Sequence, residues 1–122
     1  MKHILLVDDV STNLKCVGLI LKNKYKLTMV KSGREALDSL KNAIPDLVLL
    51  DIHMQDMDGY EVMQHMNEKP ETAEIPVILL TADSEEGTEE RGVALGAVGF
   101  IRKPFEPQVL LDRIAAVWKT EE

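Results

Sequence analysis

The stretch "LVLLDIHMQDMDGYEV" (residues 47–62) decides the fold of this chain. Four apolar residues, Leu47 to Leu50, run directly into Asp51, and a turn rich in Asp and Gly follows. A short, continuously apolar run is typical of a parallel strand that is covered on both faces. The stretch therefore predicts a buried strand that carries a carboxylate at its end, followed by a helix from Gly59.

The rest of the chain repeats this alternation of strand and helix. Apolar runs predict strands over residues 3–7, 26–30, 46–50, 76–80 and 98–101. Helical spacing predicts helices over residues 11–22, with Ser11 or Thr12 as the cap, and over residues 33–43, 59–68, 84–96 and 107–119. Five strands and five helices in strict alternation predict an α/β fold, a doubly wound (βα)5 three-layer sandwich around a parallel five-stranded sheet. The 122 residues are expected to form one domain, residues 1–122.

The composition excludes several classes of protein. A formal net charge of -7 argues against direct binding of nucleic acid, which requires Lys and Arg to neutralise phosphates. No apolar run approaches the roughly 20 residues that span a bilayer, and the N-terminus does not resemble a signal peptide. We therefore expect a cytoplasmic protein without membrane insertion. Cys16 is the only cysteine, so an internal disulfide is impossible, and we expect it to pack in the core.

Polar residues stand at the carboxyl ends of four predicted strands. Asp8 and Asp9 end the first strand, Asp51 the third and Thr81 the fourth, while Lys103 follows the fifth. Open α/β sheets bind ligands beyond the carboxyl ends of their strands. We therefore expect these five side chains to converge. The plain alternative is that the "DD" pair serves only as loop and helix-cap chemistry.

The residue types at this edge suit a cation and a phosphoryl group. Three carboxylates held close together repel one another unless they are protonated or gather a cation, and Mg²⁺ prefers oxygen ligands. An ammonium such as Lys103 and a hydroxyl such as Thr81 suit phosphoryl oxygens. A carboxylate can also be the nucleophile that accepts a phosphoryl group, and Asp51 is the candidate.

Four motifs, taken in order, resemble the receiver domain of two-component response regulators, in particular the single-domain chemotaxis regulators. They are "LLVDD" (5–9), "DLVLLDIHMQDMDGYE" (46–61), "PVILLTA" (76–82) and "GFIRKPF" (99–105). The resemblance extends from Lys2 to about Trp118. It implies a flavodoxin-like sheet of order 2-1-3-4-5 and phosphorylation of Asp51 by a histidine kinase, a phosphotransfer protein or a small phosphodonor.

The resemblance also implies a metal site and a switch. Mg²⁺ would be held by Asp8, Asp9, Asp51 and the backbone carbonyl of His53. Thr81 and the backbone of Ala82 would bind the phosphoryl group, and Lys103 would pair with it. Movement of Thr81 and Phe100 would remodel the face of the fourth helix, fifth strand and fifth helix. An output protein, or a second copy in a phosphorylation-dependent dimer, would bind that face.

In the family that this chain resembles, other positions affect the rate at which the phosphoryl group is lost and the order of the loop after the acceptor. His53 and Asp83 occupy the positions that tend to set how fast the phosphoryl group is lost. Gln55 stands where the family commonly carries Pro, which loosens that turn. The Lys103–Pro104 bond is often cis in the family, and the sequence leaves its isomer open.

The resemblance implies a domain that is not an enzyme for an external substrate, although it catalyses its own phosphorylation and dephosphorylation.

Three other functions share parts of this pattern. A phosphate-independent adaptor would have the same fold but would not need the intact set of site residues. An aspartyl-phosphate hydrolase would need a second Asp two residues after Asp51, where this chain has His53. A flavodoxin-like cofactor protein would need a less acidic loop than "DDVSTN" after the first strand. The motifs name neither the kinase nor the output partner, and an effector domain beyond residue 122 would change the output.

Overall fold

The computed structural model describes residues 1–82 and 87–119, and it contains one five-stranded parallel sheet of order β2-β1-β3-β4-β5. The strands are β1 (His3–Val7), β2 (Lys26–Val30), β3 (Leu47–Asp51), β4 (Val77–Thr81) and β5 (Gly99–Arg102). The helices are α1 (Ser11–Leu21), α2 (Gly33–Asn42), α3 (Gly59–Asn67), α4 (Pro70–Ala73), α5 (Thr88–Ala94) and α6 (Pro107–Trp118). The predicted fold class and strand order are therefore confirmed.

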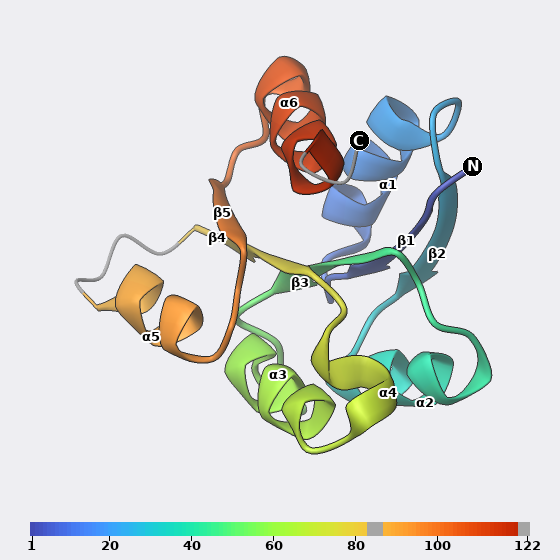
Figure 1. Cartoon of the computed structure of the whole chain (residues 1–122). Helices are drawn as coiled ribbons and strands as arrows, with labels where there is room; N and C mark the ends of the chain where they lie inside the picture. Colours follow the sequence, from blue (N-terminus) through green and yellow to red (C-terminus); the bar gives the residue numbers. More distant parts are fainter. Residues whose placement is uncertain (83–86, 120–122) are drawn as a thin grey trace.

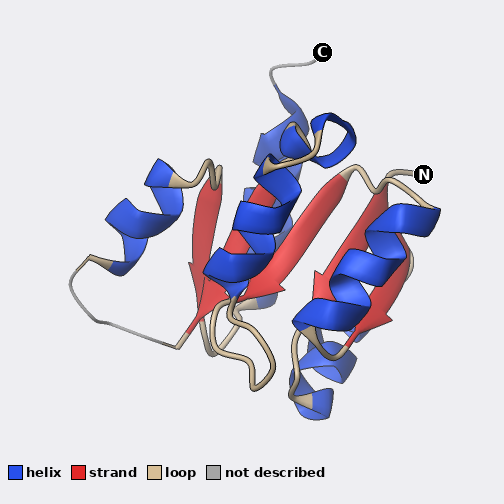
Figure 2. Ribbon diagram, turned by 90° about the horizontal axis from the view of Figure 1, so that it is seen from below, coloured by secondary structure: helices blue, strands red, loops and turns tan. Residues whose placement is uncertain are grey.

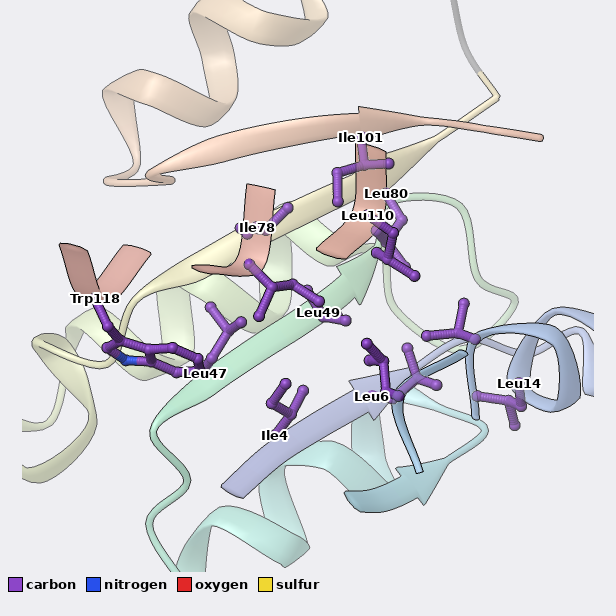
Figure 3. Close-up of a cluster of buried hydrophobic side chains, with 13 residues drawn as sticks. Ile4, Leu6, Leu14, Leu47, Leu49, Ile78, Leu80, Ile101, Leu110 and Trp118 are labelled. Atoms are coloured by element: carbon purple, nitrogen blue, oxygen red, sulfur yellow. The ribbon is translucent and has the colours of Figure 1, made fainter. Parts of the chain in front are cut away.

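The sheet is the middle of three layers. Helices α1 and α6 cover one face, and α2, α3 and α5 cover the other (Figures 1 and 2). Along β3, Leu47 and Leu49 point into the first core, while Val48 and Leu50 point into the second. Figure 3 shows the first core, in which side chains of the strands meet α1 and α6. The continuous apolar runs thus have a structural reason, because both faces of each central strand are buried.

Helix α1 differs from the prediction in its cap and in the position of Cys16. Its N-cap is Val10, without a side-chain hydrogen bond, so neither Ser11 nor Thr12 caps it. Its buried residues are Leu14, Val17, Gly18 and Leu21, which follow the spacing i, i+3, i+4, i+7. Cys16 lies outside this stripe and is exposed, so the prediction that it packs in the core was wrong.

A sixth helix was missed because it is only four residues long. Helix α4 begins with Pro70, which suits the first turn of a helix, and the buried Thr72 donates its hydroxyl hydrogen to the carbonyl of Met66 at 2.7 Å. Its ordering therefore depends on a contact with the end of α3. The predicted helix over residues 84–96 is present as α5, shorter than expected, and residues 83–86 lie outside the described part of the chain.

The last helix packs on the core through Leu110, Ile114 and Trp118, whereas Val109 is 40% exposed. The Trp118 ring lies 5.7 Å from the Tyr25 ring, centroid to centroid. This contact joins the end of α6 to the segment before β2. Among the described residues, no helix is long and apolar enough to span a membrane.

Candidate functional site

The register of the sheet brings the ends of four strands to one edge. Val7 of β1 pairs with Leu50 of β3, so Asp8 and Asp51 follow at the same level. Thr81, the last residue of β4, pairs with Arg102 of β5, and the backbone N–H of Lys103 donates to the Thr81 carbonyl at 2.9 Å. Strand pairing alone therefore places side chains from distant parts of the sequence beside one another.

Three carboxylates meet at this edge, as the sequence predicted. Asp8, Asp9 and Asp51 each offer an oxygen, and these atoms all lie within 4.8 Å of one another. Asp8 is 1% exposed and Asp51 is 3% exposed, so two of the three acids have lost most of their contact with water. Burying several like charges together is unfavourable without a counter-charge.

Lys103 supplies a counter-charge in the same site. Its Nζ lies 3.0 Å from Asp51 Oδ1 and 3.1 Å from Asp8 Oδ2, and its side chain is 16% exposed. Burial lowers the pKa of Lys103, but the hydrogen bond to Asp51 and the two nearby carboxylates raise it by more, so the pKa lies above its usual range. Lys103 is therefore a permanent cation that bridges the two buried acids.

The ammonium of Lys103 does not balance three acids, and the raised pKa of Asp51 reflects this. Burial raises the pKa of Asp51, the hydrogen bond from Lys103 lowers it, and repulsion by Asp8 and Asp9 raises it further, to about 6. Asp51 is consequently ionised at neutral pH but carries its charge at a cost in free energy. A divalent cation placed among the three acids would remove that cost.

Asp8 is fixed by partners that the sequence analysis missed. Its Oδ1 accepts from the backbone N–H of Val10 at 3.0 Å, and its Oδ2 accepts from Asn13 Nδ2 at 3.1 Å. Asn13 lies in the first turn of α1, so this helix orients the carboxylate. The sequence alone does not distinguish Asn13 from any other polar residue near the start of a helix.

The loop after Asp51 returns tightly to the strand. Gly59 donates its backbone N–H to the Ile52 carbonyl at 2.7 Å, and a Cβ on Gly59 would lie 2.7 Å from the Asp51 carbonyl oxygen. Only glycine permits this close approach without displacing the backbone. Asp58 then caps α3 through a capping box with Glu61. His53 lies in this loop and is exposed.

Phe100, the predicted switch residue, lies partly buried against the second core. Its ring occupies the space beside Gly92 of α5, because a Cβ on Gly92 would overlap the Phe100 ring and lie 2.7 Å from Leu79 Cδ1. The Phe100 carbonyl accepts from Arg113 Nη1 of α6 at 2.8 Å. The residue therefore contacts both helices of the predicted output face.

The remaining predicted site residues are placed as follows. Thr81 is 2% exposed at the end of β4, and Ala82, the next residue, is exposed. Asp83 lies outside the described residues. The Lys103–Pro104 peptide bond is cis, which answers the question that the sequence left open.

A family model of the response regulator receiver domain matches residues 4–115. The chain belongs to this family. A probable cyclic di-GMP phosphodiesterase of Vibrio cholerae is 40% identical over 111 residues, which cover 91% of this chain and 25% of that protein. The receiver domain spans from about a quarter to a half of the length of the first curated relatives that it matches.

Solved structures give the same family. The chemotaxis protein CheY4 of Vibrio cholerae has a TM-score of 0.91 and 30% identity, covering 96% of this receiver domain and 98% of that chain. The receiver domain of the sensor histidine kinase PA1611 from Pseudomonas aeruginosa has a TM-score of 0.84 and 29% identity, covering 96% of each chain. The latter was solved with a magnesium ion coordinated in its active site cleft.

Proposed function

We propose that this receiver domain is a phosphorylation-controlled switch that accepts a phosphoryl group on Asp51. The observation that carries the proposal is the contact of Lys103 Nζ with Asp51 at 3.0 Å and Asp8 at 3.1 Å, inside a cluster of three carboxylates. A buried nucleophile, acidic neighbours and a fixed cation at one sheet edge are the groups that phosphoryl transfer to a carboxylate requires.

The transfer forms one bond and breaks one. An oxygen of the ionised Asp51 attacks phosphorus, and an O–P bond forms. The bond from phosphorus to the imidazole nitrogen of a phosphohistidine breaks, or, with acetyl phosphate, the bond to the acetate oxygen breaks. The leaving group departs with the electron pair of the broken bond. A pKa of about 6 keeps Asp51 ionised at neutral pH, as a nucleophile must be.

Mg²⁺ is the cation that we propose for the acidic cluster. The oxygen atoms of Asp8, Asp9 and Asp51 lie within 4.8 Å of one another, which suits a hard ion bound by carboxylates and water. Bound there, it would neutralise the negative charge shared by the acids and the phosphoryl oxygens. The backbone carbonyl of His53 is the proposed fourth protein ligand.

The other site residues hold the product. Thr81 and the backbone N–H of Ala82 are proposed to donate hydrogen bonds to the phosphoryl oxygens. Lys103 would exchange its bond to the free carboxylate for one to the phosphoryl group. His53 and Asp83 are proposed to tune the lifetime of the phosphoryl group by flanking the path of the attacking water. Receiver domains are in general regulatory modules rather than enzymes.

The face formed by α5, β5 and α6 is the proposed output surface. It exposes the apolar side chains of Val93 (63%), Val98 (57%) and Val109 (40%) beside a surface ion pair between Glu89 and Arg102 at 3.3 Å. Phosphorylation would shift Thr81 and Phe100 and so change this face for a partner protein or a second copy. A histidine kinase or phosphotransfer protein is the proposed donor.

Intact-mass measurement tests the proposal. The protein is incubated with acetyl phosphate and Mg²⁺, in parallel with the Asp51→Asn variant and an EDTA control. We expect one phosphoryl addition that requires both Asp51 and Mg²⁺. If no addition is found, beryllofluoride separates a short-lived product from an adaptor that never uses the site. A wild-type protein that binds neither Mg²⁺ nor beryllofluoride would refute the proposed function.

A further inference from the structure

Asp56 links the loop after the acceptor strand to a different helix. One carboxylate oxygen accepts from the backbone N–H of Gly33 at 3.1 Å, and the other accepts from the backbone N–H of Arg34 at 2.9 Å. Gly33 and Arg34 are the first two residues of α2, whereas Asp56 lies between β3 and α3. Helices α2 and α3 lie side by side on the same face of the sheet (Figure 1). The contact is therefore a tertiary cap that joins them at their starts.

This cap satisfies backbone groups that α2 could not satisfy by itself. The first N–H groups of a helix have no partner within the helix. The Ser32 hydroxyl accepts from Glu35 N–H at 3.0 Å, and Asp56 accepts from the two preceding N–H groups, those of Gly33 and Arg34. Asp56 is exposed, and the slight loss of hydration that raises its pKa is outweighed by the hydrogen bonds from Arg34 and Gly33, so the pKa lies below its usual range.

Two other contacts hold the same loop in place. Met57 follows Asp56 and lies against Gly33 so closely that a Cβ on Gly33 would overlap the Met57 side chain. The base of the same loop is closed by the hydrogen bond from Gly59 N–H to the Ile52 carbonyl at 2.7 Å. The loop is thus closed at its base, directly after β3, and tied at its far side to α2. Between these two ties lies His53, two residues after Asp51.

We propose that Asp56 is a positioning residue for the acceptor site. By holding residues 52–58 against α2, it fixes the backbone at His53 beside Asp51, and it supplies the order that Gln55, in place of a proline, does not. This inference rests on the proposed function, because it assigns to the loop the task of presenting a carbonyl to Mg²⁺. Asp56 itself does not touch the metal or the phosphoryl group.

The test compares two caps of the same helix. Asp56→Ala removes the link between loop and helix, whereas Ser32→Ala removes the other cap of α2 and leaves the loop untouched. Both variants are expected to lower the urea midpoint to a similar extent. Only Asp56→Ala is expected to weaken Mg²⁺ binding, by about tenfold, as supporting residues around a metal site typically do. Isothermal titration calorimetry measures the binding, and circular dichroism confirms the fold.

Two further variants separate positioning from general destabilisation. Asp56→Asn keeps one oxygen acceptor, so its Mg²⁺ affinity should fall between those of the wild type and Asp56→Ala. Gln55→Pro, introduced into Asp56→Ala, should restore most of the lost affinity because it stiffens the same turn. Failure of the proline to restore any affinity would contradict the claim that Asp56 acts by ordering the loop.

The outcomes distinguish this inference from the proposed function. If the wild type binds Mg²⁺ and accepts a phosphoryl group, and Asp56→Ala binds Mg²⁺ equally well, the positioning role is wrong while the proposed function stands. If the wild type binds no Mg²⁺, the proposed function fails first. Hydrogen exchange still tests the link in that case, because Asp56→Ala should speed exchange of the amides of Gly33, Arg34 and residues 53–57, while Ser32→Ala should leave the loop amides unchanged.

Discussion

Asp51 is predicted to reduce the stability of the metal-free protein at neutral pH. Its folded pKa of about 6 lies above the ordinary value of 3.8, because burial and the neighbouring acids disfavour its charge. Between these two pH values the folded state holds a proton that the unfolded state has released, so stability falls as the pH rises through that window. Below pH 4 the penalty is absent, and above pH 6 it is complete. Asp51→Asn carries no charge and therefore avoids the penalty.

The magnitude follows from the same values. A rise of the Asp51 pKa from 3.8 to about 6 corresponds to about 3 kcal/mol of unfolding free energy. This value is already net of the favourable contact with Lys103, because the hydrogen bond from Lys103 is among the causes that set the Asp51 pKa. We therefore expect Asp51→Asn to be more stable than the wild type by up to about 3 kcal/mol at pH 7.5, or up to roughly 15 °C in Tm.

Thermal and urea unfolding in EDTA measure this difference at pH 7.5 and again near pH 4. The stability gained by Asp51→Asn should shrink towards zero near pH 4. At pH 7.5, saturating Mg²⁺ in place of EDTA should also reduce this gain, because Mg²⁺ stabilises the wild type. Asp38→Asn is the matched control, because it removes one charge from an exposed carboxylate whose Lys41 partner is 4.0 Å away. That control should change stability by less than about 0.5 kcal/mol. An Asp51→Asn variant that is less stable than the wild type at pH 7.5 would refute the reasoning.

Two other predictions concern the metal and the switch. Protons compete with Mg²⁺ for Asp51, so the apparent Mg²⁺ Kd should rise about twofold near pH 6 and about tenfold at pH 5 relative to pH 8, as titration calorimetry can measure. Gly92→Ala should destabilise the protein by about 1–3 kcal/mol in urea unfolding, because its Cβ would overlap the Phe100 ring. When Gly92→Ala is combined with Phe100→Ala, the double variant should lose less unfolding free energy than the sum of the two single losses. Strict additivity would show that the two residues do not compete for this space.

Much of the fold could be read from local pattern. The buried strands appear as apolar runs because both faces of a central parallel strand are covered, and turn residues such as Gly59 mark where each strand stops. The acids and Lys103 were predicted to meet because parallel strands end at the same edge of a sheet. The predicted strands β3, β4 and β5 were displaced by one residue, since Asp51, Thr81 and Arg102 still take part in the strand pairing.

The failures have a common cause in packing. The helical spacing of α1 was recognised, but one edge of its buried stripe was misplaced, so Cys16 was assigned to the core instead of Leu14 and Gly18. Several faces of a short apolar helix look alike in sequence, and only contact with the sheet selects one. Helix α4 is likewise too short to show a period, and the buried hydroxyl of Thr72 orders it through a contact with Met66.

The sequence by itself determined the alternation of strands and helices and the residue types at the carboxyl edge, because these depend on the period of the side chains and on strand direction. Only the tertiary structure decided the pKa of Asp51, the position of the Phe100 ring beside Gly92, and the hydrogen bonds from the start of α2 to Asp56. Each of these depends on distances between atoms far apart in the chain. Such distances are set when the sheet register and the helix packing are complete.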